Sequence, residues 1–483
     1  MRYLYGADVK KIQGYISGSS RLTEIAGASE LVEYVCTDLF DEFTGNSGAV
    51  EKIIAAAGKI RAVIADRETA EKIMSGFPKC VVEAADGIQF VQAIVEIAHE
   101  VTAADSHQLE SRLQQEMPMP SPLRDWSVVA KYPRSGKPVA ELCGGESLDR
   151  AAFQKRRAVD QHWKKLRRKF GVPGFPSDFK KIAGTDSFIA VIHADGNSLG
   201  QKLMKLEGGA QYESRWKAFS QELDDATTMA ALTAYRGLGE KKFRPIILGG
   251  DDLTVICSAD EAIGFTKRYL EAFRDETAKK PSLQELTACA GIAFIKENYP
   301  FHFGLELAEL LCSEAKKRAK ARTVSPVPSC LMYGLELGSF IESGFDDIKR
   351  RRLTAGKVTL DFGPYATSGS GGLPQLEDML EAARTLAGRN PLRTGLRRYL
   401  SELHVDRVSA DFLARRIQQV AEEKDPGRLQ RLLAALEKIT GRGGGLENSL
   451  VNGQGRSPVL DLLVLAKFMT QEGGVEKNDE SAI

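Results

Sequence analysis

The chain has 483 residues, too many for one compact hydrophobic core, so two to four domains are expected. Its 66 Lys and Arg residues balance 65 Asp and Glu residues, and the net charge of +1 excludes a uniformly basic nucleic-acid-binding protein, so any such surface must be local. The hydrophobic fraction of 43% is that of an ordinary soluble protein.

The chain begins with a short apolar strand that turns at Asp8 into a helical pattern, in the segment YLYGADVKKIQGYI. No apolar signal region is present there, and no stretch approaches the ~20 apolar residues that a membrane span needs. The seven cysteines stand singly without a C-x-x-C pair, which favours a reduced chain with neither a disulfide framework nor a closed zinc site. We therefore expect a cytoplasmic protein with no membrane partner.

The same opening pattern returns in the middle of the chain, in the segment IAVIHADGNSLGQKL. Each copy is an apolar strand, then Ala-Asp, then a polar turn into a helical pattern, so that Asp8 and Asp195 take the same place. About fifty residues after each opening comes a hairpin pattern, EKIIAAAGKIRAVIAD in the first half and RPIILGGDDLTVIC in the second. The two halves therefore predict an internal duplication with a β–α–hairpin plan.

Only the second copy of the hairpin carries acids at its turn. Lys59 and Ile60 of the first half stand where the second half has Asp251 and Asp252. We therefore expect one live site, in the second half. Without partner acids, Asp8 is expected to cap or brace a turn.

Between the two halves, residues 139–180 read as irregular and strongly basic. The run QKRRAVDQHWKKLRRK holds eight basic residues and one tryptophan. It predicts either an RNA-binding surface, with Lys164, Arg167 and Arg168 as its candidates, or a solvated basic helix. The single Cys143 nearby cannot hold zinc by itself.

Three acids of the second half predict a divalent-metal site. Asp195 ends a strand that is apolar on both faces, and a hairpin in neighbouring strands would bring Asp251 or Asp252 beside it. A turn distortion is needed for both hairpin acids to face one site, because consecutive strand residues point to opposite faces. Three carboxylates with phosphate oxygens and water suit Mg²⁺ or Mn²⁺. The structural alternative is a plain type I′ turn, but the matching strand-end acid favours metal.

Several glycines and one lysine are candidates to bind a triphosphate. Gly249 and Gly250 would let phosphates lie close to the backbone. The backbone N–H groups of Gly196 and Asn197 could bind phosphate, although a plain helix-start turn has the same pattern. Lys316 could reach a triphosphate, although lysines late in helices are usually solvated.

The rest of the chain adds two helices and a strand to the second half and ends in helices. SADEAIGFTKRYLEAFRDETAKK and FGLELAELLCSEAKKRAKAR have helical spacing, and LTACAGIAFI reads as a strand. A low-complexity stretch, ATSGSGG, is expected to be a linker. Beyond it, four amphipathic segments predict an all-α C-terminal part.

Together these segments resemble the large polymerase/cyclase subunit of type III CRISPR-Cas effector complexes, of the Cmr and Csm types. The segments that carry the resemblance are GADVKKIQGYISGSSRLTEIAGASELV, ADGNSLG, LGGDD and AGIAFIKENYPFHFGLELAELLCSEAK. The resemblance implies an α+β fold with two ferredoxin-like palm domains and a C-terminal all-α helical domain. We accordingly expect a degenerate palm domain at 1–138, a basic linker region equivalent to a reduced zinc element at 139–180, a GGDD palm domain at 181–365 and the helical domain at 366–483.

The resemblance also implies a function. ATP would be polymerised and cyclised into cyclic oligoadenylate when the complex meets target RNA. By position, Asp195, Asp251 and Asp252 would hold two Mg²⁺ or Mn²⁺ ions. The nucleotide contacts would be Gly196, Asn197, Gly249, Gly250 and Lys316. The expected partners are the effector backbone subunits, guide RNA and target RNA.

Two departures from the family pattern bear on this expectation. The family commonly begins with a nuclease domain marked by a His-Asp pair, whereas here the palm pattern starts at residue 1 and no His precedes an Asp, so DNA cleavage by this chain is not expected. The zinc-binding cysteine pairs are reduced to Cys143. Two alternatives stay open: a stand-alone cyclic-nucleotide synthase of another antiphage signalling system, and a non-catalytic RNA-binding scaffold.

Overall fold

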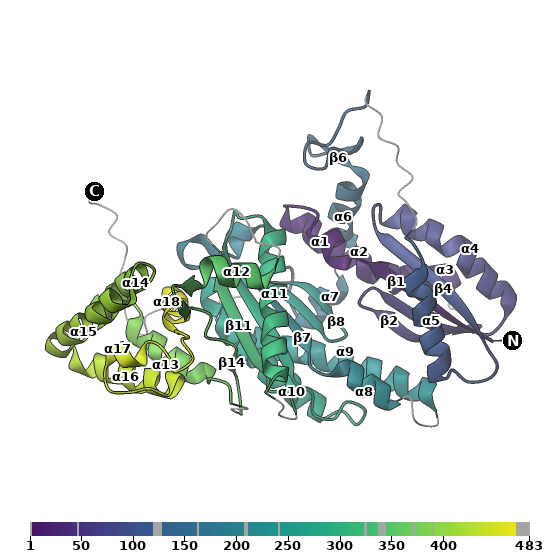
Figure 1. Cartoon of the computed structure of the whole chain (residues 1–483). Coiled ribbons are helices and arrows are strands. Elements are labelled where there is room, and N and C mark those ends of the chain that lie inside the picture. Colours follow the sequence, from purple (N-terminus) through teal and green to yellow (C-terminus); the bar gives the residue numbers. More distant parts are fainter. Residues whose placement is uncertain are drawn as a thin grey trace.

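The structure is a computed structural model and describes most of the chain. The described residues are 2–45, 48–118, 128–161, 164–206, 211–239, 242–322, 326–336, 344–369, 372–388 and 390–469. Three parts lie side by side in chain order, with the N-terminal sheet at one end, a larger sheet in the middle and a group of helices at the other end (Figure 1). Among the described helices, none combines the length and the apolar composition that crossing a bilayer requires.

The first part is a four-stranded antiparallel sheet in the order β2-β3-β1-β4. Its strands are β1 (Arg2–Lys10), β2 (Val50–Ala56), β3 (Lys59–Ile64) and β4 (Gln89–Ile97). The helices are α1 (Ile12–Ser17), α2 (Leu22–Cys36), α3 (Asp38–Thr44), α4 (Arg67–Ala84) and α5 (Ala103–Gln115). Alternate strand residues face opposite sides, so one face packs against α2, α3 and α4 and the other against α5.

The middle part is a six-stranded sheet in the order β14-β11-β10-β7-β9-β8. Its strands are β7 (Phe188–Gly196), β8 (Phe243–Gly249), β9 (Asp252–Ser258), β10 (Ala288–Lys296), β11 (Cys330–Leu335) and β14 (Tyr365–Ala366). All neighbours are antiparallel except the pair β10 and β11. The run β8-β9-β7-β10 repeats the order β2-β3-β1-β4 of the first sheet, as expected from the repeated sequence pattern.

Helices cover both faces of the middle sheet. They are α8 (Leu199–Leu206), α9 (Tyr212–Arg236), α10 (Ala262–Ala278), α11 (Phe301–Lys320) and α12 (Phe345–Arg352), with a short 3₁₀ turn, η3 (Ala259–Glu261), before α10. Even-numbered residues of β7, such as Ile192, face the core shared with α9 and α10. Odd-numbered ones, such as Val191, face α11 and the first part. Because side chains alternate, Asp195 lies on the α11 side.

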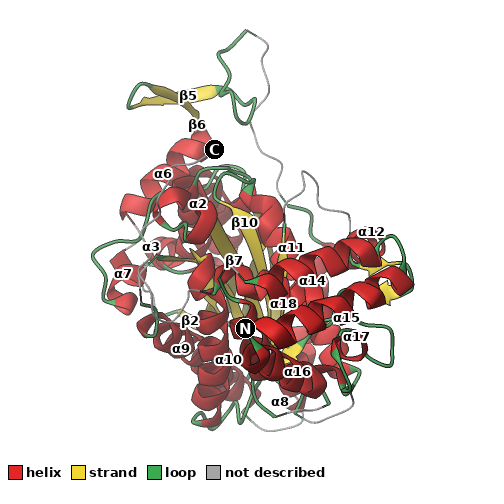
Figure 2. Cartoon of the chain, turned by 90° about the vertical axis from the view of Figure 1, so that its left-hand side faces the viewer, coloured by secondary structure: helices red, strands yellow, loops and turns green. Residues whose placement is uncertain are grey.

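The region between the two sheets is ordered where the structure describes it, although an irregular segment was expected. It holds the hairpin β5 (Val139–Cys143) and β6 (Glu146–Asp149), the helices α6 (Arg150–Gln161) and α7 (Lys164–Phe170), and the 3₁₀ turns η1 (Phe179–Lys181) and η2 (Thr185–Ser187). The hairpin projects away from the rest of the molecule (Figure 1, Figure 2). Helix α6 lies so close to α2 that a Cβ on Gly27 would overlap the carbonyl of Lys155, which accounts for the glycine.

The C-terminal part is helical, as expected. Two two-residue strands, β12 (Thr354–Ala355) and β13 (Val358–Thr359), precede α13 (Leu376–Leu386), α14 (Pro391–Leu403), α15 (Arg407–Lys424), α16 (Pro426–Thr440), α17 (Leu446–Ser449) and α18 (Val459–Phe468). Asn390, Asp406 and Asp425 begin α14, α15 and α16 by accepting hydrogen bonds from backbone N–H groups of the first turn. The helices share one hydrophobic core with the middle sheet, where the Phe468 ring stacks on Phe294 at 4.5 Å between centroids.

Candidate active site

The end of β7 and the turn between β8 and β9 bring three carboxylates together. Ala194 lies opposite Leu253 in the antiparallel pair β7–β9, so the next residue, Asp195, falls beside Asp252 at the start of β9. Asp251 occupies the turn itself. One carboxylate oxygen from each of Asp195, Asp251 and Asp252 lies within 4.8 Å of the other two. The predicted juxtaposition of the strand end and the hairpin turn is thus observed.

The hairpin turn has the distorted backbone that two consecutive acids require. Gly249 pairs with Asp252, which leaves Gly250 and Asp251 as a two-residue loop. Gly250 has φ of 61°, a left-handed conformation that glycine adopts without the steric cost of a Cβ. The turn therefore carries Asp251 out of the strand alternation and toward the site.

Neighbouring groups hold this turn in place. The hydroxyl of Thr227, on α9, donates to the carbonyl oxygen of Gly250 at 2.6 Å, and Asp224 accepts from the Gly250 N–H at 3.3 Å. Gly196 leaves room for Asp251, because a Cβ there would lie 3.1 Å from the Asp251 Cβ and 2.6 Å from Leu199. Gly196 and Gly250 thus both lie beside the acids, while phosphate binding by these glycines stays a prediction.

The three acids are half-buried and repel one another. Burial, and then the charges of Asp252 and Asp195, raise the pKa of Asp251 to about 7. Burial and Asp195 raise the pKa of Asp252 to about 6, against the opposing charges of Lys59 and Lys316. A divalent cation would offset both the repulsion and the lost hydration. An all-carboxylate donor set fits Mg²⁺ or Mn²⁺, and it does not fit zinc, which takes His and Cys.

Lys316 projects from α11 onto the strand-end acid. Its Nζ lies 2.5 Å from Oδ2 of Asp195. Both residues line a cavity of about 1030 Å³ that also reaches Asp251. Two more lysines, Lys202 and Lys320, line the same cavity. Lys316 is the cation beside the acids, whereas Lys202 donates to the carbonyl oxygen of Leu283 in another part of the cavity wall.

Asn197 has a different role from the predicted one. It is only 2% exposed, and its backbone N–H donates to the carbonyl oxygen of Thr287 at 2.7 Å. Its side-chain amide donates to the Thr287 hydroxyl and accepts from the Cys289 thiol. The expectation that this N–H faces a phosphate is therefore wrong for this conformation, because Asn197 ties the loop after β7 to β10.

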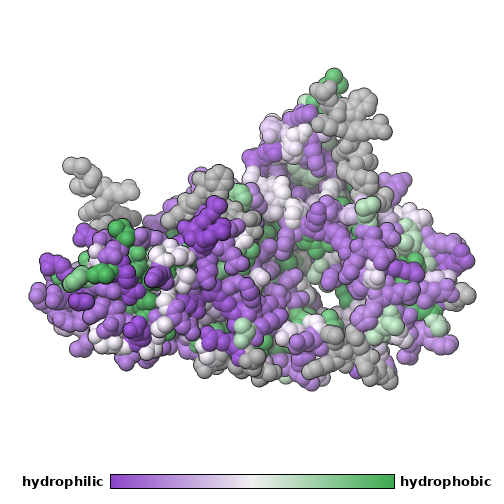
Figure 3. Space-filling view, viewed as in Figure 1, coloured by the Kyte–Doolittle hydropathy of each residue, from purple (hydrophilic) through white to green (hydrophobic). Residues whose placement is uncertain are grey.

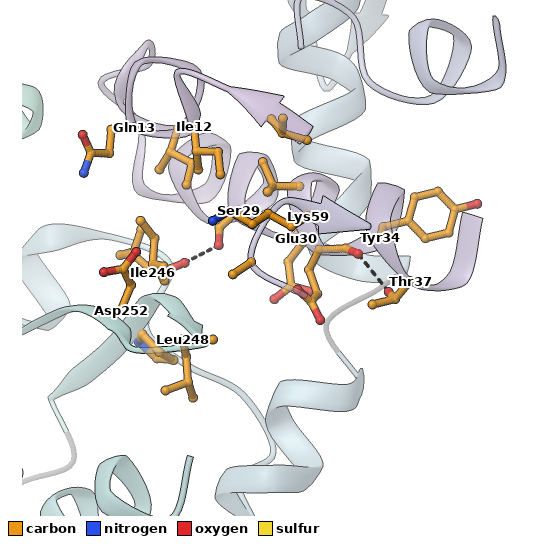
Figure 4. A pocket seen from close by; sticks show the side chains of 18 of the residues that line it. Ile12, Gln13, Ser29, Glu30, Tyr34, Thr37, Lys59, Ile246, Leu248 and Asp252 are labelled. Atoms are coloured by element: carbon orange, nitrogen blue, oxygen red, sulfur yellow. Dashed lines mark hydrogen bonds between the residues drawn. The ribbon is translucent and has the colours of Figure 1, made fainter. Parts of the chain in front are cut away.

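A second cavity, of about 560 Å³, lies between the two sheets and ends at Asp252 (Figure 4). The first part contributes Ile12, Gln13 and Lys59, and the middle part contributes Leu248 and Asp252. A hydrogen bond from the Ser29 hydroxyl to the Ile246 carbonyl joins the two walls. The space-filling view shows an opening between these two parts of the molecule (Figure 3).

A third cavity, of about 900 Å³, runs along β2 and α9 and reaches Asp251 and Asp252. Ala57, in the turn between β2 and β3, faces the other hairpin, and a Cβ on Gly249 would lie 3.6 Å from the Ala57 Cβ. Gly249 and Gly250 both line this cavity. The two hairpin turns therefore approach each other, and the acids are reached from three sides.

Asp8 lines the cavity between the two sheets, but its carboxylate pairs with a buried cation and not with the three acids. Its Oδ1 lies 2.8 Å from Nη1 of Arg61, whose side chain is 1% exposed. Burial alone would raise the pKa of Asp8, but the charge and hydrogen bond of Arg61 outweigh it and lower that pKa. Glu110 pairs with the same guanidinium at 2.6 Å. Asp8 thus braces β1 against β3 rather than a turn.

Sequence reasoning missed two polar residues near the acids. His193 lies two positions before Asp195 on the same face of β7, and its Nδ1 is 3.1 Å from the Thr254 hydroxyl. Glu309 lies on α11, where burial and Asp252 raise its pKa to about 7. Strand alternation points to His193, and the seven-residue spacing from Lys316, two helical turns, points to Glu309.

The basic run divides into an internal part and a surface part. Lys155 is buried and donates to the carbonyl of Tyr15, and Arg156 pairs with Glu24 at 2.7 Å. Arg168 is exposed and Arg167 is half-buried. The Lys164 side chain and the run's tryptophan lie outside the described residues. RNA binding by this run stays a prediction.

Comparison with known proteins gives a family for the middle of the chain. Residues 188–324 match the sequence model described as Cas10/Cmr2, second palm domain. A comparison with curated proteins found no match.

Three solved structures share the fold over nearly the whole chain. A Csm1–Csm4 cassette in complex with cA3 has a TM-score of 0.54 at 14% identity and covers 97% of this chain and 69% of its own. Csm1 of T. onnurineus has a TM-score of 0.54 at 17% identity, covering 97% and 70%. A Csm1–Csm4 cassette in complex with cA4 has a TM-score of 0.51 at 14% identity, covering 98% and 70%.

The chain is shorter than these relatives, and it spans 54% of the chain matched in an apo Csm1–Csm4 cassette. The family match covers β7 and the β8–β9 hairpin, which carry the three acids, and the helices that pack on them. The predicted resemblance is thereby confirmed: residues 188–324 match the second palm domain of the Cas10/Cmr2 family, and the chain shares its fold with the Csm1 structures.

Proposed function

We propose that the chain is a metal-dependent nucleotidyltransferase that converts ATP into cyclic oligoadenylate. The observation that carries the proposal is the meeting of Asp195, Asp251 and Asp252, of which Asp195 and Asp251 line a cavity that also holds three lysines. The solved relatives were captured with cA3 and with cA4, products of the proposed kind. An ATP-bound cassette is similar too, with a TM-score of 0.52 at 13% identity.

In this proposal each residue of the site has a defined task. The three aspartates hold two Mg²⁺ or Mn²⁺ ions, which would lower the pKa of the attacking hydroxyl and stabilise the leaving pyrophosphate. Lys316 leaves Asp195 to meet phosphate oxygens. Gly196, Gly249 and Gly250 leave space for the phosphates beside the backbone. Asn197 positions the loop after β7 through Thr287 and does not touch phosphate.

The proposed architecture follows the strand orders. Residues 1–138 are a palm domain that has lost its acids, and 181–365 are the GGDD palm domain, because both sheets repeat one topology. Residues 139–180 are the basic linker region that replaces a zinc element, and 366–483 are the helical domain. The cavity between the two palms gives room for a second nucleotide next to Asp252.

We further propose that the chain works inside a type III CRISPR antiviral complex with backbone subunits, guide RNA and target RNA. Similarity to Csm1 bound to Csm4 supports a backbone partner. RNA would meet the exposed side of the basic run, which includes Arg168. The runner-up, a stand-alone synthase, predicts ATP turnover by the purified chain without RNA.

The decisive experiment is pyrophosphate release from ATP by the reconstituted complex with target RNA and Mg²⁺ or Mn²⁺. Asp251→Asn with Asp252→Asn should lower the rate on the order of 10²-fold or more, because two ligands of the ions are lost. Folding and assembly should be unchanged, since removing like charges relieves repulsion.

The matched control is Asp346→Asn with Asp347→Asn, an adjacent acid pair on α12 that lines none of the three cavities. It should turn over ATP like the unaltered chain. Full activity of the Asp251 and Asp252 variant would overturn the catalytic proposal. Absence of pyrophosphate release from every version, with all partners present, would leave the scaffold interpretation.

A further inference from the structure

A cavity of about 830 Å³ opens between helices α14, α15 and α18 of the C-terminal part, away from the three acids. These helices lie side by side in both views of the chain (Figure 1, Figure 2). The cations that line the cavity are Arg393, Arg397, Arg398, Arg416 and Lys467. One acid, Asp186, lines it among the described residues. The cavity thus gathers five positive charges from three helices around one negative charge.

The single acid is already paired, and the arginines are not. Lys467 lies 2.8 Å from Asp186. In the described part of the chain, no carboxylate forms an ion pair with Arg393, Arg397, Arg398 or Arg416. Arg393 donates from Nη1 to the carbonyl oxygen of Gly388, and its buried Nε has no hydrogen-bond partner there. The guanidinium groups therefore keep most of their donors available to a ligand.

The helix geometry places these arginines close together, and the repulsion between their like charges costs stability. Arg393 and Arg397 stand one turn apart on α14, and Arg416 faces them from α15. Burial and then the charge of Arg397 lower the pKa of Arg393. Like charges at this spacing destabilise a helix, and an anion in the cavity would reverse that effect.

The other residues that line the cavity indicate which class of anion it would bind. The floor is aliphatic and comes mainly from α15, including Leu413, Ile417 and Val420. No aromatic side chain of the described residues lines the cavity, so nucleobases find no aromatic ring to stack on. A guanidinium group presents a planar fork of donors that matches phosphate oxygens in a bidentate way. The recognition would therefore be of phosphate rather than of base.

The geometry points to a phosphate-binding site in this C-terminal cavity, formed by Arg393, Arg397, Arg398 and Arg416. Its ligand class is a polyphosphate or a phosphodiester chain. The site is separate from the nucleotidyltransferase site and does not depend on the function proposed for that site. The two sources of the same chemistry, a small phosphate and a nucleic-acid strand, are distinguished by experiment.

The test measures binding of inorganic tripolyphosphate and of a short single-stranded oligoadenylate to the full chain by calorimetry in EDTA. EDTA removes divalent cations from the three aspartates, and the lysines of the cavity beside them are the same in every variant, so a loss of binding in one variant reports on the C-terminal cavity. Arg397→Glu with Arg398→Glu alters two exposed residues and should weaken binding about tenfold or more. For the oligoadenylate, the logarithmic salt slope should fall by about 1.4, at ~0.7 per lost phosphate contact. Tighter binding of the tripolyphosphate marks a small ligand, and tighter binding of the oligoadenylate marks a strand.

Two further variants make the result specific to the cavity. Lys424→Glu with Arg431→Glu makes the same change in net charge at exposed positions outside the cavity and should bind both probes normally. Arg397→Lys with Arg398→Lys keeps the charge but loses the planar fork of donors, so it should weaken tripolyphosphate binding while the logarithmic salt slope for the oligoadenylate stays unchanged. An equal loss of affinity in the cavity variant and in its control would overturn the proposed site. Absence of phosphate binding by the unaltered chain would also overturn it. Polyglutamate binding as tight as phosphate binding would instead indicate an acidic protein partner.

Discussion

Asp8 and Asp195 occupy corresponding positions in two strands of the same topology, yet their surroundings differ. Asp195 faces two other acids and the ammonium group of Lys316. Asp8 faces the buried guanidinium group of Arg61, which also donates to the carbonyl oxygens of Ala7 and Ile60. One aspartate is therefore placed to hold an external cation, and the other already holds an internal one.

Replacing these two aspartates should separate catalysis from stability. Asp195→Ala should cost on the order of 10²-fold or more in ATP turnover at matched folded concentration, with modest effects on unfolding. Asp8→Ala should leave turnover per folded molecule intact but lower the free energy of unfolding by roughly 1.5–3 kcal/mol, because the buried guanidinium group of Arg61 loses one of its two carboxylate partners and keeps only Glu110. A turn residue would cost only about 1 kcal/mol. Turnover and denaturant unfolding of both variants check this.

A compensating variant tests the reason for the Asp8 effect. Asp8→Leu with Arg61→Met removes both charges and should recover much of the lost stability. Equal, severe losses of turnover in Asp8→Ala and Asp195→Ala would contradict the view that one palm is live and would show that the first sheet takes part in the chemistry.

The parts of the site that could be predicted are those that depend only on residues close together in the sequence. The two hairpin acids and the strand-end Asp195 follow from local strand patterns and from the repeat. The role of Asn197 could not be predicted, because its partner Thr287 lies ninety positions away in the sequence. The approach of Lys59 to Asp252 depends on how two sheets pack, and no local pattern encodes that packing.

At the scale of elements, the contact between α11 and β10 sets where Lys316 stands. Gly291 of β10 faces the helix so closely that a Cβ there would overlap the carbonyl oxygen of Ala308 and crowd the backbone of Cys312. The last two turns of the helix carry Lys316 to Asp195. A helix and strand were both predicted from periodicity, but their closeness depends on missing side chains, at Gly291 of the strand and at Gly304 of the helix, where a Cβ would lie 2.6 Å from Ile295.

Gly291→Ala should push α11 away from the sheet and shift Lys316. Overpacking of this kind costs about 1–3 kcal/mol of stability. We also expect a raised KM for ATP, because Lys316 would move away from its present position in the cavity wall. Gly427→Ala is the control, because a Cβ at Gly427 meets nothing within 4 Å. Unchanged unfolding and KM in Gly291→Ala would show that the helix adapts without cost.

At the scale of the whole molecule, the boundary expected near residue 366 does not divide the hydrophobic core. Phe468 of α18 packs on Phe188 of β7 and Phe294 of β10. Asp461 of the same helix accepts hydrogen bonds from the Phe362 N–H and the Tyr365 hydroxyl. A low-complexity stretch identifies a linker in the sequence, but it gives no information on whether the segments beside it pack together.

A chain that ends at residue 368 should therefore not fold into a stable, soluble monomer. It would expose Phe188 and Phe294 on the sheet, and each large apolar side chain left in water costs about 1.5–3 kcal/mol. We expect aggregation or strong binding of a hydrophobic dye, measured by light scattering and fluorescence. Co-expression with residues 372–469 should restore a soluble complex. A monomeric, stable truncation would show that the helical part is a separate domain.

The ammonium groups near the acids have a consequence for the order in which ligands arrive. Lys59 and Lys316 both favour the charged form of Asp252, and Lys316 also contacts Asp195. These two ammonium groups offset part of the negative charge of the acids, so that the chain can fold before a divalent ion binds. In the proposed mechanism, a metal ion would compete with Lys316 for the carboxylate of Asp195. The same event frees a positive charge for the incoming phosphates, so that cation and nucleotide would load together.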